Sequence, residues 1–138
     1  MYLCTERKEL WKAFSYGYTG QLLWAIAQWY VNPWNDPWYA GLNCCGVLYY
    51  PHGKGFLEST RLKVYTESLQ DYEYLTILKE RAEKYYTLYG ESSLVSQAKN
   101  IYQDTELVEK IKTIDDLTEM RKRIASLIIQ LDAERKIF

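Results

Sequence analysis

The stretch YGYTGQLLWAIAQWYVNPWNDPW, residues 16–38, decides the fold. Residues 21–30 within it form a nearly unbroken apolar run, which predicts a β-strand covered on both faces. Residues 31–43 combine turn-forming asparagine, aspartate and proline with large rings. A buried strand that leads into an aromatic loop is a common way to build a concave binding site. The stretch holds four of the chain's five tryptophans: Trp24, Trp29, Trp34 and Trp38.

The length and composition indicate one ordinary domain and exclude several functional classes. The 138 residues carry a net charge of −1, so nothing draws the chain to nucleic acid or to an anionic membrane. The three cysteines have neither a disulfide framework nor zinc-ligand spacing, and Cys44 and Cys45 are expected to be free thiols. We therefore expect no metal and no cofactor. Neither a signal peptide nor a membrane span is indicated.

Charged residues are distributed unevenly along the chain. The sequence has 17 basic and 18 acidic side chains, and residues 1–50 hold only six of them: Glu6, Arg7, Lys8, Glu9, Lys12 and Asp36. The first third therefore has the composition of an interior, and the remainder that of a solvated helical coat. This contrast predicts that the first third is not covered by the helices alone.

Local patterns predict a mainly α fold with one or two short strands. A helix over residues 6–16 ends at Gly17, and a short strand covers residues 45–50, before a flexible turn at residues 51–55. Apolar residues at helical spacing over residues 57–89 then predict a long helix, and Ser59 or Thr60 is expected to cap its start. Further helices are expected from Ser92 or Ser93, over residues 104–111, and after a capping box at residues 113–116.

Several motifs in combination resemble one known family. WKAFSYGYTG at residues 11–20 is followed by LLWA at 22–25, Trp29 and NPW at 32–34. A second group consists of STRL at residues 59–62 and SLQDYEYL at 68–75. GVLYYP, at residues 46–51, lies between the first group and the second. Together they resemble the C-terminal part of glycoside hydrolase family 123 and its relatives, also described as domain of unknown function number 4091. The final helices resemble the family's tail, so the resemblance spans nearly the whole chain.

The resemblance implies both a fold and a chemistry. Intact members are (β/α)8 barrels that act on glycosides of 2-acetamido sugars such as N-acetylgalactosamine. Their mechanism is substrate-assisted: the acetamido oxygen attacks the anomeric carbon, an Asp orients the acetamido group, and the adjacent Glu is the general acid and base. This sequence contains no Asp-Glu dipeptide. It resembles the last βα unit and the C-terminal helices of such a barrel, whose missing N-terminal segment is the expected partner.

The sequence also departs from the family pattern at one step. Members commonly have an acidic GDG step before the YP element, whereas this chain has NCCG at residues 43–46. Residues 43–46 are therefore not expected to supply what that acidic residue contributes in other members of the family.

The candidate substrate-binding residues are Trp24, Trp29, Asn32 and Trp34, and no catalytic or metal-binding residue is assigned. The apolar face of a pyranose stacks on an aromatic ring while its hydroxyls seek polar partners, and Asn32 offers one. The alternative is that the tryptophans are packing residues and Asn32 is a turn former. Trp34 is favoured for sugar contact because loops that follow barrel strands line the site.

Other polar residues are expected to have structural roles. Asp71 and Glu73 lie on nearly opposite sides of a helix, so they do not form an acid pair. Glu67 and Asp71 share a face, and an ion-paired or solvated role is favoured over catalysis. The only histidine, His52, is expected in a solvent-exposed turn.

Two functional hypotheses follow. In both, residues 1–56 supply a helix, a buried strand and an aromatic loop, residues 57–138 form a helical C-terminal region, and residues 1–138 make one structural unit. In the first, the chain is the C-terminal part of a glycoside-hydrolase-like protein, is inactive alone, and contributes one side of a sugar site. In the second, it is an independent helical module that binds carbohydrate or a protein partner through an aromatic patch. A remnant of a broken gene is a lesser third possibility.

Overall fold

The computed structural model describes residues 2–22, 26–36, 38 and 48–134. This part of the chain is mainly helical with one two-stranded antiparallel sheet, which confirms the predicted class at that level. Its elements are, in chain order, α1 (Tyr2–Ser15), β1 (Tyr49–His52), β2 (Gly55–Glu58), α2 (Thr60–Tyr89), α3 (Ser93–Tyr102), α4 (Thr105–Lys110) and α5 (Ile114–Glu134).

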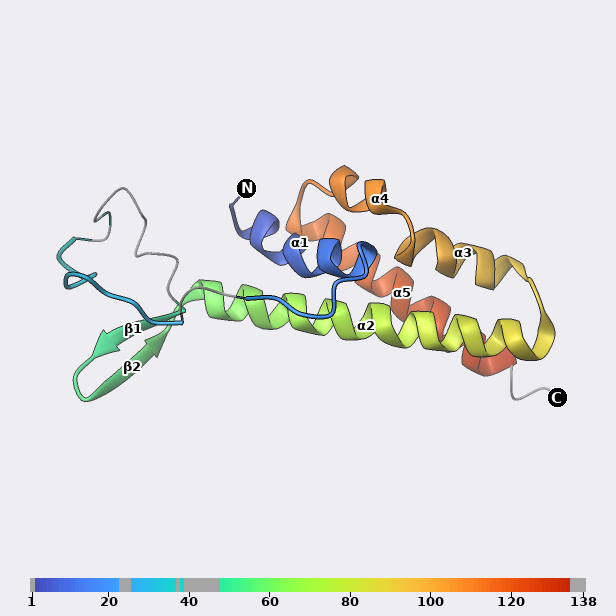
Figure 1. Ribbon diagram of the computed structural model, residues 1–138, viewed down its shortest axis with the longest axis horizontal. Helices are drawn as coiled ribbons and strands as arrows, with labels where there is room; N and C mark the ends of the chain where they lie inside the picture. Colours follow the sequence, from blue (N-terminus) through green and yellow to red (C-terminus); the bar gives the residue numbers. More distant parts are fainter. Residues whose placement is uncertain (1, 23–25, 37, 39–47, 135–138) are drawn as a thin grey trace.

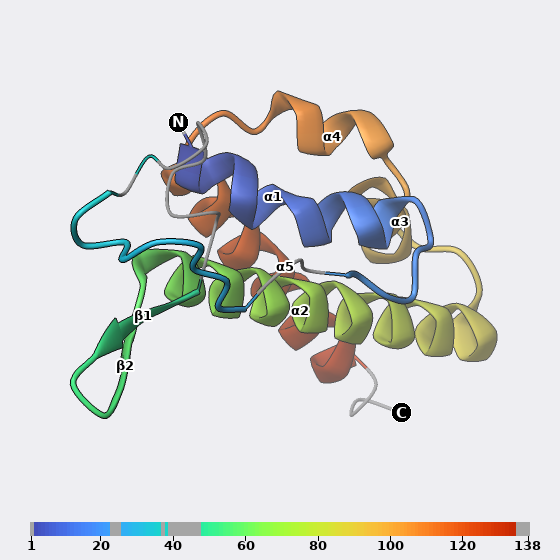
Figure 2. The same cartoon turned by 60° about the vertical axis from the view of Figure 1, so that its left-hand side comes forward.

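Helix α2 is the axis of the molecule, with three helices packed along it and α4 packed on α1. Helices α1, α3 and α5 all contact it, while the β1–β2 hairpin projects beyond its N-terminal end (Figure 1). The turned view shows α1 between α4 and α2 (Figure 2). The hairpin therefore lies beyond one end of the helical bundle.

Local chemistry sets the helix ends, as predicted. The Ser59 hydroxyl accepts a hydrogen bond from the Leu62 amide (3.2 Å) at the start of α2, and Ser92 begins α3 in the same way. Before α5, Thr113 Oγ1 accepts from the Asp116 amide (3.0 Å) while Asp116 Oδ2 accepts from the Thr113 amide (2.8 Å). This reciprocal pair is the predicted capping box.

Helix α1 ends at a glycine in the left-handed conformation. Gly17 has φ +73°, its amide bonds the Phe14 carbonyl (3.0 Å), and the Tyr18 amide bonds the Ala13 carbonyl (2.8 Å). This is the Schellman pattern, which satisfies two otherwise unpaired carbonyls and turns the chain back along α2. The predicted end of the helix is confirmed, although the helix begins at Tyr2, earlier than residue 6.

The apolar core lies between α2 and the helices that cover it. Trp11 of α1 is 1% exposed and packs with Leu75, Leu78 and Ala82 of α2. Helix α5 contributes four residues to the same core at helical spacing: Leu117, Ile124, Leu127 and Leu131. Burial on this scale is the main source of the bundle's stability.

The N-terminal half of α2 departs from the predicted apolar face. Ser68 and Asp71 are the buried residues there, whereas Leu69 is 45% exposed. The reason is electrostatic, because arginine side chains from α1 and α5 converge on Asp71. From Leu75 onward the buried positions are apolar, as predicted.

The hairpin was only partly predicted. Tyr50 pairs with Leu57 and Pro51 with Phe56, and Gly53 (φ +53°) supplies the left-handed residue that a two-residue hairpin turn needs. The residues expected to form a flexible turn are therefore mostly strand. Pro51 is tolerated because its carbonyl faces away from β2, so the missing N–H removes no ladder bond.

The predicted buried strand at residues 21–30 is wrong for its described residues. Residues 21–22 and 26–30 have no strand structure, and Leu22 and Ile26 are 86% and 57% exposed. A strand buried on both faces needs hydrogen-bonded neighbours and covering helices, and the described part of the chain places neither beside these residues. The Ile26 carbonyl instead accepts the Leu48 amide (2.9 Å) next to β1.

Candidate functional site: an aromatic cluster on the hairpin

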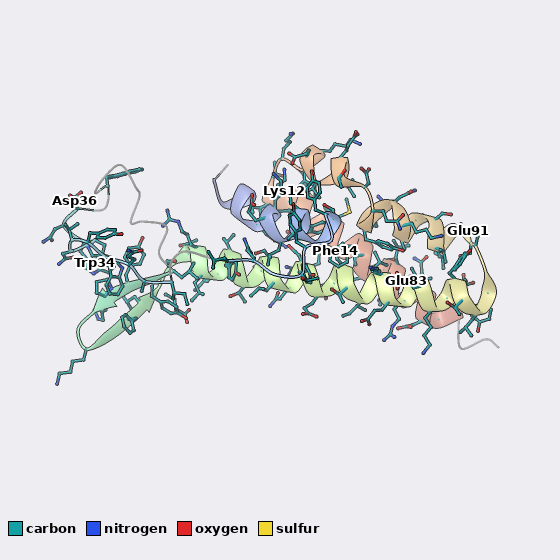
Figure 3. All side chains as sticks on the ribbon, viewed as in Figure 1. Lys12, Phe14, Trp34, Asp36, Glu83 and Glu91 are labelled. Atoms are coloured by element: carbon teal, nitrogen blue, oxygen red, sulfur yellow. The ribbon has the colours of Figure 1, made fainter. Side chains whose placement is uncertain are left out.

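Large rings gather around the β1–β2 hairpin and the loop that precedes it. Trp29 packs on Phe56 with ring centroids 5.9 Å apart, and Phe56 meets Tyr49 edge-on at 6.4 Å. Trp34 packs on Tyr50 at 5.1 Å. These five residues, which we call the hairpin aromatic cluster, lie well away from the core of the bundle, and Figure 3 shows Trp34 at this end of the molecule.

The two described candidate tryptophans contact opposite faces of the hairpin. Successive side chains of a strand alternate between the faces, and directly paired residues share a face. Tyr50 pairs with Leu57, so Tyr50 projects on the face opposite to Phe56. Trp29, on Phe56, and Trp34, on Tyr50, therefore cannot form one continuous stacking surface.

Trp34 is the better placed of the two for stacking on a ligand. Its side chain is 55% exposed, and its indole N–H donates to the Pro51 carbonyl (2.7 Å), which fixes the ring orientation. Trp29 is half-buried, and its indole N–H is buried with no acceptor in the described part of the chain. A ring that is oriented on one side and open on the other is suited to stack on a sugar.

Asn32 has the role of a turn former. Its side-chain oxygen accepts the Trp34 amide (2.9 Å), and its carbonyl accepts the amides of Asn35 and Asp36 (both 3.1 Å). Asp36 in turn accepts the Trp38 amide (3.3 Å). Consecutive side-chain-to-backbone bonds of this kind shape the loop that presents Trp34. These contacts are those of a turn residue, and a sugar contact by Asn32 stays a prediction.

Some candidate residues cannot be placed. Trp24, the fourth candidate, lies outside the described residues, as do Cys44, Cys45 and the first half of the predicted strand at 45–50, whose last two residues belong to β1. Asn32 and Trp34 lie two positions apart in one loop. Trp34 contacts one face of the hairpin, and Trp29 contacts the other face.

Among the described residues, the buried carboxylate of Asp71 belongs to an ion-pair network. Asp71, with a fully buried side chain, accepts from Arg7 Nε (2.8 Å) and from Arg121 Nε (2.5 Å). Glu67, one turn earlier, lies 2.8 Å from Arg121 Nη1. Burial acts to lower the pKa of Arg121, but its bonds to Asp71 and the nearby charges raise it overall. The ion-paired role expected for Glu67 and Asp71 is confirmed.

Sequence reasoning missed Arg121 as the third member of this network. A signal existed, because Arg121 lies four residues after Leu117 and three before Ile124, both core residues of α5. An arginine on the buried face of a helix requires a carboxylate partner. Spacing on α5 identifies the need, but it cannot indicate that the partner lies on α2.

Other chemical groups of the described residues form no evident reactive site. No group of three or more histidine, cysteine, aspartate or glutamate side chains with metal-binding geometry occurs in the described ranges. His52 is exposed at the end of β1, as expected of a surface histidine. Among the helices described, none is long and apolar enough to cross a membrane.

Comparison with known proteins identifies the family. The family model of the glycoside hydrolase 123 catalytic domain matches residues 3–78. The chain belongs to glycoside hydrolase family 123. The match covers α1, the aromatic loop, the hairpin and α2 as far as Leu78, so the hairpin aromatic cluster lies within the family region and α3 to α5 lie beyond it. Searches of the curated proteins and of the solved structures gave no significant match.

Proposed function

We propose that this chain is the C-terminal part of a family 123 glycoside hydrolase and contributes the aromatic side of a site for 2-acetamido sugars. In this account Trp34 stacks on the sugar, and Trp29 packs against the rest of a (β/α)8 barrel. The Asp-Glu pair that performs the chemistry belongs to a preceding segment. The chain alone is then without glycosidase activity.

The observation that carries this proposal is the concentration of exposed apolar residues in the family region. Residues 22–57 expose Leu22, Ile26, Tyr30, Val31, Trp34, Trp38, Phe56 and Leu57. Apolar surface gathered in this way marks a site of association. Beyond the family region the exposed large apolar residues among the described ones are fewer: Tyr86, Leu88, Tyr89, Ile114 and Ile129. A larger body against the loop and hairpin would cover the first set and leave the second in solvent.

The chemistry of the proposed site follows from substrate assistance. The carbonyl oxygen of the 2-acetamido group attacks the anomeric carbon as the glycosidic bond breaks, and the general acid protonates the leaving oxygen. Water then opens the cyclic intermediate, and the same carboxyl group accepts the proton of that water. Trp34 takes no part in these proton transfers. Its contribution is to hold the ring in place, and its loss would affect substrate binding before chemistry.

A second candidate function is supported by the closed core of the helices. Trp11, Leu78, Ile124 and Leu131 are at most 1% exposed without any further chain. A bundle that buries its own core can fold independently. The alternative is therefore an independent helical module that binds carbohydrate or a protein partner through its exposed aromatic residues.

The coding sequence upstream of Met1 discriminates between these functions. We expect it to contain, in frame, further strand–helix repeats and an Asp-Glu step. The joined protein should hydrolyse a chromogenic N-acetylgalactosaminide, and Trp34→Ala in that protein should raise KM more than it lowers kcat. An unrelated gene upstream, with this chain monomeric and folded, would contradict the proposal and support the independent module.

A further inference from the structure

A second concave surface lies along the middle of the bundle, away from the hairpin. It is a cleft of about 500 Å³ between the C-terminal end of α1, the middle of α2 and the end of α3. Phe14 and Glu83, both labelled in Figure 3, belong to its lining. Its volume falls within the range of small-ligand sites. None of its residues belongs to the hairpin aromatic cluster.

Aromatic rings form the apolar part of this cleft. Phe14 and Tyr72 meet edge-on with centroids 5.1 Å apart, and the Tyr72 hydroxyl donates to the Tyr18 carbonyl (3.3 Å). That bond holds the segment after α1 against α2. Tyr18 is 62% exposed, so its ring is available to a ligand. The cleft thus has a fixed aromatic wall and an accessible aromatic rim.

Polar groups without protein partners complete the lining. Tyr102 is only 6% exposed, and its hydroxyl bonds to no other described residue. Burial is the largest cause of the raised pKa of Tyr102, so the hydroxyl keeps its proton at neutral pH and can donate it to a ligand. The exposed Gln103 also lines the cleft, and its side-chain amide bonds no described residue. The Tyr102 residue is buried, but its hydroxyl oxygen is not sealed from solvent, so a ligand or water in the cleft can bond it.

The charges of the cleft favour a neutral ligand. Lys79 and Glu83 line it together, with Lys79 Nζ 3.9 Å from Glu83 Oε1. Their opposite charges offset one another, and no further charged side chain belongs to the described lining. An anion such as phosphate would want several donors of one sign. Rings combined with hydroxyl and amide groups suit a polyhydroxylated ring instead.

We propose that this cleft binds one ring of a neutral carbohydrate, at a site separate from the hairpin aromatic cluster. The apolar face of the sugar lies on Tyr18 and Phe14, and its hydroxyls bond Tyr102 Oη and the Gln103 amide. Such a site would hold a glycan chain away from any catalytic centre. It does not depend on the function proposed for the hairpin, because no lining residue is shared.

The test is an NMR titration of the full chain with N-acetylgalactosamine and, separately, with methyl glucoside and with inorganic phosphate. We expect saturable shifts of the Tyr18, Thr19 and Gln103 amides with the two sugars and none with phosphate. Tyr102→Phe removes one hydroxyl and keeps the ring, so the sugar affinity should fall about three- to tenfold. Trp34→Ala should leave these shifts unchanged, which separates this site from the hairpin.

The matched control is Tyr86→Phe, the same chemical change at an exposed tyrosine of α2 outside the cleft lining. It should bind both sugars as tightly as the wild type. The proposal is overturned if no amide of the cleft shifts with sugar, if shifts are confined to residues 26–36 and 48–58, if phosphate binds the cleft, or if Tyr102→Phe binds as tightly as Tyr86→Phe. A thermal unfolding midpoint for each variant verifies that it is folded.

Discussion

Arg7 and Asp71, 64 positions apart in sequence, are joined by two hydrogen bonds inside the protein. Arg7 Nε lies 2.8 Å from Asp71 Oδ2, and Arg7 Nη2 lies 3.1 Å from Asp71 Oδ1. Both side chains are buried, and Arg121 approaches the same carboxylate from α5. One aspartate therefore joins three helices, and two of them, α1 and α2, contribute to the family region.

Asp71→Asn should destabilise the helical bundle strongly. The substitution keeps the shape of the side chain but removes the buried negative charge that the two arginines share. Arg7, which is buried, and Arg121 then have only the half-exposed Glu67 as a counter-charge. Loss of one member of a buried ion pair costs about 3 kcal/mol or more. Urea unfolding followed by circular dichroism measures the change in the free energy of unfolding.

The control for this substitution is Glu73→Gln, an exposed carboxylate two residues further along α2. A surface change of this kind should alter the free energy of unfolding by less than about 0.5 kcal/mol. If both variants lost the same free energy of unfolding, the ion-pair network would contribute no more to stability than one charged carboxylate on the surface of the helix.

The capping box predicts a specific pH dependence. Hydrogen bonds from the Lys112 and Thr113 amides lower the pKa of Asp116 below its ordinary value of 3.8. A carboxyl group with a lowered folded-state pKa stabilises the protein fully above its unfolded-state pKa, and this contribution is lost as the pH falls through the folded-state pKa. The stability difference between the wild type and Asp116→Asn should therefore be largest above about pH 4 and shrink toward pH 2.

Urea unfolding at several pH values between 6 and 2 measures this difference. Asp115→Asn, at the adjacent exposed position of α5, is the matched control because no side-chain bond to the Thr113 or Lys112 amide involves it. A difference for Asp116→Asn that stays constant over the whole range would contradict the assignment.

Two tryptophan substitutions should differ greatly in their effect on the free energy of unfolding. Trp11 is 1% exposed at the centre of the core, so Trp11→Ala should cost about 3 to 5 kcal/mol. Trp34 is 55% exposed on the hairpin, outside the core cluster, so Trp34→Ala should change the unfolding of the helices by less than about 0.5 kcal/mol. Urea unfolding measures both, and a large global loss for Trp34→Ala would show that the hairpin belongs to the cooperative core.

The helices could be predicted from sequence because their signals are local. Ser59, Ser92 and the Thr113–Asp116 pair act within one turn of the helix that each begins, and Gly17 ends α1 through its own conformation. The strand expected at residues 21–30 depends on neighbours that no local pattern specifies, and it is absent from the described residues there. Of the network around Asp71, the sequence indicated only that Glu67 and Asp71 share one face of a helix. The arginine partners could not be predicted, since Arg7 and Arg121 come from distant positions.

The candidate site was predictable in composition and not in geometry. The tryptophans and Asn32 were identified from residue type, but the faces that Trp29 and Trp34 contact follow from the hairpin register, which pairs Tyr50 with Leu57. Because Pro51 lies in β1, the sequence indicated a turn instead of a strand at this point. Long-range register is fixed by packing, which single-sequence patterns do not contain.

Hydrolysis of 4-nitrophenyl N-acetylgalactosaminide by this chain alone tests the central claim most directly. These 138 residues contain no Asp-Glu pair, so release of nitrophenolate should equal that of a buffer blank at every pH tested. Clear, saturable turnover by the purified chain, abolished by substitution of one of its own carboxylates, would contradict the account.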